Sequence, residues 1–235
     1  HNMAETLNID VRTPENLKGN LAEYNFLEEF NADLGIVVAY GKILPENFLP
    51  LAKKGFINIH ASILPSWRGA APIQRAIMNM DNKTGISIMK INNKLDAGPI
   101  CNKYEVDIKK QDNAETISEK LSMLASEKIL DEIDSIIDGK ANFVEQDKKK
   151  ATYAKKIEKF EGKINWNNSA DEILGLINGL YPAPGAWFIY KGERHKILKA
   201  DVGNARGEPG IVLSENLEIG CKEKSLKIIK IQREG

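Results

Sequence analysis

Three polar side chains, those of Asn58, His60 and Asp96, have the types and the spacing that catalysis could use. Asn58 and His60 end an apolar run that starts at Phe56, and residues two apart in an extended chain point to the same side. Asp96 lies in a Gly-containing loop, "NNKLDAGPI" (92–100), between two strand-like runs. An amide, an imidazole and a carboxylate without an adjacent Ser or Cys nucleophile suit direct transfer of an acyl or formyl group to an amine. The amide and imidazole would stabilise the oxyanion, and the carboxylate would orient the imidazole or pass on the amine proton.

Each of these residues also has an ordinary structural interpretation. A lone His at the end of a strand is more often structural than catalytic, and Asn58 could cap a loop. Asp96 could be a turn residue, since Asp is favoured in turns. Trp67 and Arg68, in the loop that follows His60, could be surface packing. The residues alone therefore give a candidate site beside a plain structural alternative.

The sequence predicts alternating strands and helices, and these elements determine where the three side chains lie. Apolar, β-branched runs predict strands at 35–41, 55–60, 84–91 and 99–108, and a shorter one at 9–12. Helical spacing predicts helices at 17–30, 45–53, 72–80 and 114–138. This alternation predicts an α/β fold with a parallel, Rossmann-like sheet. Ligands of such sheets bind outside the carboxyl ends of the strands, where Asn58 and His60 fall.

The composition of the chain changes after Gly139, where it becomes polar and rich in lysine. Residues 1–140 are expected to form the α/β domain and the polar, lysine-rich residues 141–151 a linker. Residues 152–235 are expected to form a second domain. It would contain a helix at 169–180 with a Ser N-cap, followed by short strands punctuated by Gly, Pro and Asn. That pattern predicts a small β-barrel of the oligonucleotide-binding (OB) type.

Composition excludes several classes of protein. The 235 residues contain 42% hydrophobic and 28% charged residues, and 33 Lys+Arg balance 33 Asp+Glu, so no global charge indicates a nucleic acid. The two Cys are far apart, which predicts neither a disulfide framework nor a zinc site and favours a reducing compartment. No apolar run approaches the 18 residues that would indicate a membrane span. We expect a monomer in the bacterial cytoplasm or an organellar matrix.

Several stretches resemble the methionyl-tRNA formyltransferases, within the wider folate-dependent formyltransferase group. The most specific are "NIHASILPSWRGAAPIQRAI" (58–77) and "GISIMKINNKLDAGPI" (85–100), with further similarity at 37–45, 152–166 and 181–188. The resemblance implies transfer of a formyl group from 10-formyltetrahydrofolate to the amino group of initiator methionyl-tRNA, for translation initiation, with no metal required. It also implies that a first strand, a mobile loop and a helix precede the present residue 1.

The resemblance also implies roles for individual residues, which are assigned where positions of this sequence match the motifs of the family. Asn58, His60 and Asp96 take the catalytic roles. Two segments match the family's folate site, one holding the tetrahydrofolate and one lining the pterin pocket: Ser62, Ile63, Leu64 and Pro65, and Ala39, Tyr40 and Gly41.

Local charge fits a tRNA partner. Lysines crowd the linker and the entrance of the second domain, and phosphate contacts supply most of the affinity for nucleic acids. The predicted tRNA contacts are Arg68, Lys149, Lys150 and Lys156. A merely solvated lysine surface is the plain alternative.

Two other functions remain open from the sequence. Pro99 stands where formyltransferases acting on tRNA more often carry an acid, which is closer to the glycinamide ribonucleotide formyltransferases. A formyltransferase acting on a small amine, such as a nucleotide-linked amino sugar or glycinamide ribonucleotide, is therefore one alternative. A catalytically inactive RNA-binding protein is the other, and the intact set of Asn58, His60 and Asp96 argues against it.

Overall fold

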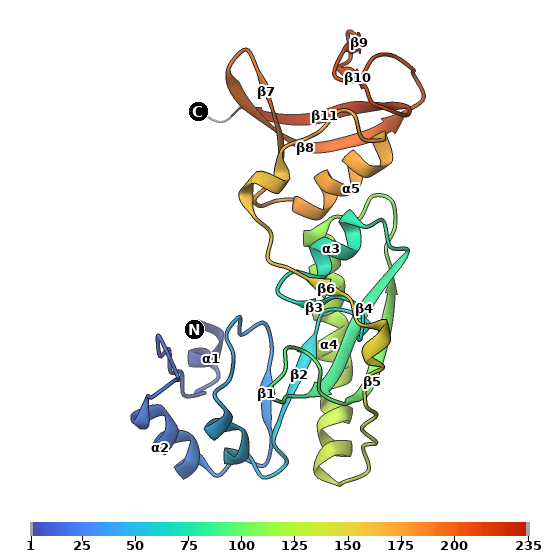
Figure 1. The fold of residues 1–235 in the computed structure, drawn as a ribbon. Helices are drawn as coiled ribbons and strands as arrows, with labels where there is room; N and C mark the ends of the chain where they lie inside the picture. Colours follow the sequence, from blue (N-terminus) through green and yellow to red (C-terminus); the bar gives the residue numbers. More distant parts are fainter. Residues whose placement is uncertain (1, 234–235) are drawn as a thin grey trace.

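The computed structural model describes residues 2–233 (Figure 1). The helices, including three 3-10 turns (η), are α1 (Asn2–Thr6), α2 (Leu21–Phe30), η1 (Glu46–Leu51), α3 (Pro72–Met78), α4 (Ala114–Ile137), η2 (Lys148–Lys150), η3 (Lys159–Gly162) and α5 (Ala170–Leu180). The strands are β1 (Gly35–Val37), β2 (Phe56–His60), β3 (Arg68–Gly69), β4 (Lys83–Lys90), β5 (Ile100–Asp107), β6 (Tyr153–Ala154), β7 (Ala186–Tyr190), β8 (Glu193–Gly203), β9 (Val212–Ser214), β10 (Glu218–Gly220) and β11 (Ser225–Arg233). Figure 1 shows an N-terminal body that runs through α4 and a C-terminal body of α5 and β7–β11.

The N-terminal sheet has the strand order β1-β2-β4-β5. The first two strands pair in parallel, with Val37 opposite Asn58. The β2–β4 and β4–β5 pairs are antiparallel. The expected parallel pairing is therefore confirmed for β1 and β2 only. For β4 and β5 the reason is the short loop 91–99 between them, since so short a connection joins antiparallel strands. The body is a Rossmann-like α/β layer with an antiparallel edge.

Two segments near the N-terminus differ from the prediction. Helix α2 begins at Leu21 rather than at residue 17, because the Asn20 side chain accepts a hydrogen bond from the Glu23 N–H and caps the helix there. The strand predicted at 9–12 is wrong. That segment has no regular structure and no partner strand among the described residues, and Ile9 is 56% exposed. An apolar run without a neighbouring strand leaves its backbone groups to water.

Helix α4 covers the sheet through its apolar face. Ile117 and Leu121 are buried against Ile77 of α3 and Ile86 of β4. The helix begins with a capping box in which Asn113 and Thr116 exchange hydrogen bonds. The prediction of a helix over 114–138 is confirmed to within one residue.

A buried carboxylate ties α4 to β5. Glu132 accepts hydrogen bonds from Asn102 Nδ2 (2.7 Å), from Cys101 Sγ (3.2 Å) and from the Tyr104 hydroxyl. Burial, reinforced by the hydrogen bond to Glu132, raises the pKa of both Cys101 and Tyr104 to about 12. Both groups therefore stay protonated at neutral pH and donate. Three donors satisfy this carboxylate, as buried polar groups require.

The connecting segment, residues 141–154, is bonded to the N-terminal body. Val144 and Ile100 exchange two backbone hydrogen bonds of 2.8 and 2.9 Å. Further along, the Thr152 N–H donates to the Pro65 carbonyl and the Thr152 hydroxyl accepts from the Trp67 N–H. Strand β6 then pairs in parallel with β3. These bonds place the segment first against the start of β5 and then against the loop that follows β2.

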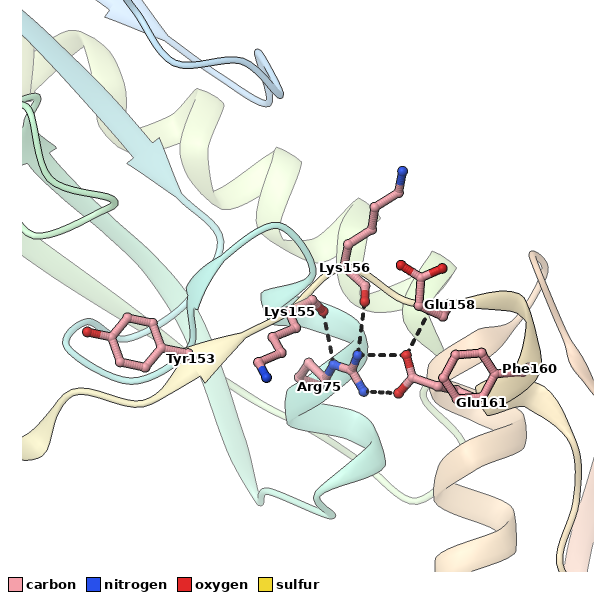
Figure 2. A pocket seen from close by; sticks show the side chains of 7 residues that line it. All are labelled: Arg75, Tyr153, Lys155, Lys156, Glu158, Phe160 and Glu161. Carbon is pink, nitrogen blue, oxygen red and sulfur yellow. Dashed lines mark hydrogen bonds and ion pairs between the residues drawn. The ribbon is translucent and has the colours of Figure 1, made fainter.

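An arginine clamp holds the chain just beyond β6. Arg75 of α3 forms two charged hydrogen bonds with Glu161, at 2.6 and 3.0 Å, and donates to the backbone carbonyls of Lys155 and Lys156 (Figure 2). The hydrogen bond from Arg75 lowers the pKa of Glu161, against the opposing effect of burial. Bidentate pairing of this kind fixes direction as well as distance.

The C-terminal body is a five-stranded antiparallel sheet in the order β7-β8-β11-β10-β9. Helix α5 packs on it through Ile173 and Ile177, which share a buried cluster with Ile197 and Leu226. Ser169 caps the helix as the sequence predicts. The ladders of the described residues leave β7 and β9 unpaired with each other, so the predicted barrel is seen only as an open sheet.

Helices α3 and α5 join the two bodies. A Cβ atom on Gly179 would lie 2.6 Å from Met78 Cγ and 3.0 Å from the Gln74 carbonyl oxygen. A larger residue would require the Met78 side chain to shift and the Gln74 carbonyl to move by a few tenths of an ångström, so glycine favours this close contact. Among residues 2–233, no helix is long and apolar enough to cross a membrane.

Candidate active site

Strand β2 and the β4–β5 loop bring the three predicted catalytic residues together. Asn58 Nδ2 lies 3.4 Å from Asp96 Oδ1, and His60 Nδ1 lies 3.7 Å from Asp96 Oδ2. Asn58 and His60 lie on β2, and the loop between β4 and β5 brings Asp96 across to that strand. The His60 side chain is 6% exposed and that of Asp96 15%. Low exposure strengthens the electrostatic interactions among these groups.

The contact of His60 with the Trp67 carbonyl determines which ring nitrogen of the neutral imidazole carries the proton. His60 Nε2 lies 2.9 Å from the Trp67 carbonyl oxygen. Because a carbonyl can only accept, this contact is a hydrogen bond only when Nε2 carries hydrogen. The second proton of an imidazolium would then be on Nδ1, which faces Asp96. A proton on Nδ1 would therefore face the Asp96 carboxylate.

The Asp96 carboxylate is fixed by a backbone donor. The Gly69 N–H donates to Asp96 Oδ2 at 2.8 Å. Gly69 has φ +122°, and a Cβ atom there would lie 2.7 Å from the Ala154 carbonyl oxygen. Asp96 itself has φ +44°, a conformation that Asp tolerates better than most residues. The geometry of the carboxylate therefore depends on both β3 and β6.

Arg68 and Gln146 form a buried pair behind Asp96. The Arg68 side chain donates to Gln146 Oε1 from Nε (3.0 Å) and Nη2 (2.7 Å). Gln146 Nε2 donates to the carbonyls of Asp96 (2.9 Å) and Gly98 (2.7 Å). Arg68 is only 5% exposed, so it does not lie on the surface in this structure, and its contact with tRNA stays a prediction. Its guanidinium is bound by Gln146, which the sequence does not single out.

A cavity of about 600 Å³ opens in front of these residues. It is lined by Asn58, His60 and Asp96, by the turn 37–44 and by the loop 91–95. Ala39, Tyr40 and Gly41 lie in its wall, where the resemblance places the pterin. The volume is in the range of small-molecule sites, and the wall combines apolar side chains with a few polar groups. These residues fit a folate-sized molecule.

The segment Ser62–Pro65 is not among the residues that line this cavity. Ser62 and Leu64 are fully buried. The Ser62 hydroxyl donates to the Ser66 carbonyl, and the Leu64 N–H donates to Ser87 Oγ. The predicted contact of Ser62, Ile63, Leu64 and Pro65 with folate therefore stays a prediction, and none of the four lines this cavity. Their polar groups are used to anchor the loop on β4.

The remaining predicted contacts are surface lysines. Lys149 and Lys150 lie in η2, and their side chains are exposed, as is that of Lys156. Figure 2 shows the Lys156 ammonium directed away from the Arg75 clamp. Within residues 2–233, no three His, Cys, Asp or Glu side chains come together as a metal site.

Comparison with known proteins agrees with this geometry. Residues 12–133 match the formyl transferase family model, and residues 156–235 match that of the formyl transferase C-terminal domain. The methionyl-tRNA formyltransferase of Pelagibacter ubique is 62% identical over 234 residues, covering 99% of this chain and 76% of that protein.

Solved structures share the fold. The sugar 3N-formyl transferase WlaRD, solved in the presence of dTDP and 5-N-formyl-THF, is 20% identical with a TM-score of 0.75, covering 99% of this chain and 80% of that one. The methionyl-tRNA formyltransferase from Clostridium thermocellum is 21% identical with a TM-score of 0.65, covering 78% of each chain. At these identities the structures establish the fold alone.

An α/β body with an amide, an imidazole and a carboxylate at one cavity, followed by a second domain of the matching type, defines a formyl transferase. With 62% identity over nearly its whole length, the chain belongs to the methionyl-tRNA formyltransferase family.

Proposed function

We propose that the chain transfers a formyl group from 10-formyltetrahydrofolate to the amino group of initiator methionyl-tRNA, as required for translation initiation. The observation that carries the proposal is the convergence of Asn58, His60 and Asp96 on one cavity. The 62% identical relative bears that enzyme's name, which selects the acceptor.

The reaction needs two kinds of help from the protein. The formyl oxygen gains negative charge when the amine adds, and the amine must then lose a proton. Folate, when bound, supplies the formyl group on its N10 nitrogen. Residues at the cavity wall must therefore stabilise an oxyanion and carry one proton from the incoming amine to the departing N10.

Asn58 is the proposed oxyanion donor. One hydrogen of its amide is directed at Asp96 over a long 3.4 Å contact, which leaves the other for the formyl oxygen. Both ring nitrogens of His60 face protein groups, so its contribution to the oxyanion is its positive charge rather than a direct hydrogen bond. This refines the role predicted from the sequence.

Asp96 and His60 are the proposed proton carriers. The carboxylate accepts the amine proton as the new C–N bond forms and passes it to Nδ1 of the neutral His60 ring, 3.7 Å away, so that the imidazole becomes positively charged while the oxyanion exists. The same proton then passes to N10 as the old C–N bond breaks. The protonation of the pair is thus restored at the end of each turnover.

The C-terminal body is proposed as the tRNA-binding domain. We take residues 1–140 as the catalytic domain, 141–151 as the linker and 152–235 as an OB-like domain acting in a monomer. The first residue and the last two lie outside the described residues. Exposed Lys149, Lys150 and Lys156 are the proposed phosphate contacts. The proposed location is the cytoplasm of a bacterium or an organellar matrix.

The test is a choice among acceptors. Formyl-labelled 10-formyltetrahydrofolate is incubated with the protein and either methionyl-tRNA, a nucleotide-linked amino sugar or glycinamide ribonucleotide. Label is expected on the methionyl amino group alone. Label on the sugar or on glycinamide ribonucleotide, with none on methionyl-tRNA, would establish the alternative function.

A further inference from the structure

We propose that Gln146 is a positioning residue for Asp96, and that through it the connecting segment becomes part of the catalytic machinery. The inference rests on the proposed function for the role of Asp96. It concerns a residue 50 positions away from Asp96, in a stretch that the sequence presents only as a linker.

All four hydrogen-bonding positions of the Gln146 amide are occupied. Nε2 donates to the carbonyls of Asp96 (2.9 Å) and Gly98 (2.7 Å). Oε1 accepts from Arg68 Nε (3.0 Å) and Nη2 (2.7 Å). A primary amide has two donors and two acceptor lone pairs, so this one is saturated. Gln146 is 8% exposed, so no partner is readily replaced by water.

Arg68 determines which way the Gln146 amide faces. A guanidinium has donors only, so it requires the oxygen of the amide and rejects the nitrogen. The nitrogen must therefore point to the Asp96 loop, where it meets two carbonyls. Because both donors of Arg68 share one oxygen, the amide is held in a single orientation.

The two bonds to carbonyls restrain the turn that carries the carboxylate. Asp96 adopts φ +44°, which is unfavourable for a residue with a side chain and persists only when the surroundings hold it. Gln146 donates to the carbonyl of Asp96 and to that of Gly98, two residues later, so its two hydrogen bonds hold the turn on both sides of this strained residue. The Asp96 carboxylate then meets the Gly69 N–H at 2.8 Å and faces Asn58 and His60.

The sharpest variant is Gln146→Glu. Glutamate keeps an oxygen for Arg68, with a charge that matches the guanidinium, but as a carboxylate it cannot donate to the Asp96 and Gly98 carbonyls. We expect kcat for formyl transfer to fall by up to about 10²-fold, the loss expected from a misplacement of the order of 1 Å. The KM for folate should change little. Glu145→Gln, at the exposed neighbouring position, is the matched control and should behave like the parent.

A double-mutant cycle separates positioning from general support of the fold. If Gln146 acts through the Asp96 carboxylate, Gln146→Glu should cost far less in an Asp96→Asn background than in the parent, measured by single-turnover transfer. The same fold-loss in both backgrounds would mean that Gln146 does not act through that carboxylate, and would overturn the inference.

Amide exchange tests the inference without activity. The Gly69 N–H is bonded to Asp96 Oδ2, so Gln146→Glu should accelerate hydrogen exchange at Gly69, while the Ile88 amide in β4 should keep its protection. Unchanged exchange at Gly69 in this variant would refute the positioning role. Failure of the parent protein to formylate methionyl-tRNA would refute the proposed function and leave this measurement valid.

Discussion

Asp96 connects every part of the candidate site. Its side chain contacts Asn58 and faces His60, while its backbone is bound by Gln146 and its carboxylate by Gly69. The groups proposed to contact the reacting atoms are therefore few, and each is held in place by residues that are not proposed to contact those atoms. Predictions at the scale of single residues follow from this division.

Loss of either β2 residue should slow the chemical step. Asn58→Ala removes the free amide donor and His60→Ala removes the charge beside the oxyanion, so each should lower single-turnover formyl transfer by about 10²–10³-fold. Asn167→Ala, at an exposed position of the C-terminal body, should have no such effect and controls for handling. A rate near that of the parent for His60→Ala would remove the imidazole from the mechanism.

Asp96→Asn should alter the pH dependence as well as the rate. The substitution keeps the shape and an oxygen for the Gly69 N–H, but removes the charge and the proton acceptor. We expect a loss at least as large as that of Asn58→Ala, together with a shifted limb of the pH–rate profile. The measurement is single-turnover transfer across pH. A profile parallel to that of the parent would show that the carboxylate does not carry the proton.

At this scale the sequence indicates the three candidate residues, which the structure brings together, but not the residues that hold them in place. Asn58, His60 and Asp96 can be chosen because polar residues at strand ends are informative. Arg68 and Gln146 cannot be paired, because their hydrogen bonds join residues 78 apart and leave no periodic signal. The segment Ser62–Pro65 is assigned to folate by matching position alone, and burial of its groups against β4 becomes visible only in three dimensions.

At the scale of elements, β3 and β6 are the shortest strands and have a large effect on the site. Gly69→Ala would place a Cβ atom 2.7 Å from the Ala154 carbonyl oxygen, so β6 must move away from β3. We expect loss of formyl transfer and a lower melting temperature. Gly139→Ala is the matched control, because it also has a positive φ but open space around its Cβ position. It should cost only the backbone strain of about 1–2 kcal/mol and leave the rate unchanged. Equal effects of the two substitutions on the rate would contradict this role of β3.

The Arg75–Glu161 clamp should make stability depend on pH. The hydrogen bond from Arg75 lowers the pKa of Glu161 in the folded protein. The ion pair therefore stabilises the folded state fully above the ordinary glutamate pKa of about 4.3. It is lost as the pH falls through the lower folded pKa. Glu161→Gln should reduce the free energy of unfolding at pH 7 by on the order of 1 kcal/mol, and the difference should vanish in acid.

Denaturant titrations of parent and variant at several pH values test the clamp. Glu158→Gln, which removes a nearby charge that forms no ion pair with Arg75, is the control. A difference between parent and Glu161→Gln that persists in acid would show that packing, not the ion pair, is responsible.

Most elements can be predicted, and the exceptions have physical causes. Helices α4 and α5 are recognisable because caps and apolar spacing agree. The strand predicted at 9–12 fails because β propensity is insufficient without a neighbouring strand. Pairing direction in the first sheet and closure of the second depend on interactions between distant segments, which a local pattern does not contain.

At the scale of the whole molecule, the proposed tRNA surface extends from η2 onto the chain beyond β6. Charge reversal at Lys149, Lys150 and Lys156 should weaken tRNA binding and reduce the salt slope, by roughly one unit for each phosphate that is no longer neutralised. Folate binding should be unaffected. The same number of reversals at Lys18, Lys53 and Lys54, exposed in the N-terminal body, is the control for net charge. An unchanged salt slope in the first variant would mean that these lysines are only a solvated surface.

The path of the connecting segment also decides how such proteins can be recombined. A chimera joined at residue 140 would bring a foreign linker opposite Arg68 and place a residue of another origin against the carbonyls of Asp96 and Gly98. A junction after Ala154 would instead carry the native segment with the catalytic body and exchange only the part beyond β6. An exchange of C-terminal domains between formyltransferases is thus compatible with an intact active site only when the junction lies beyond that short strand.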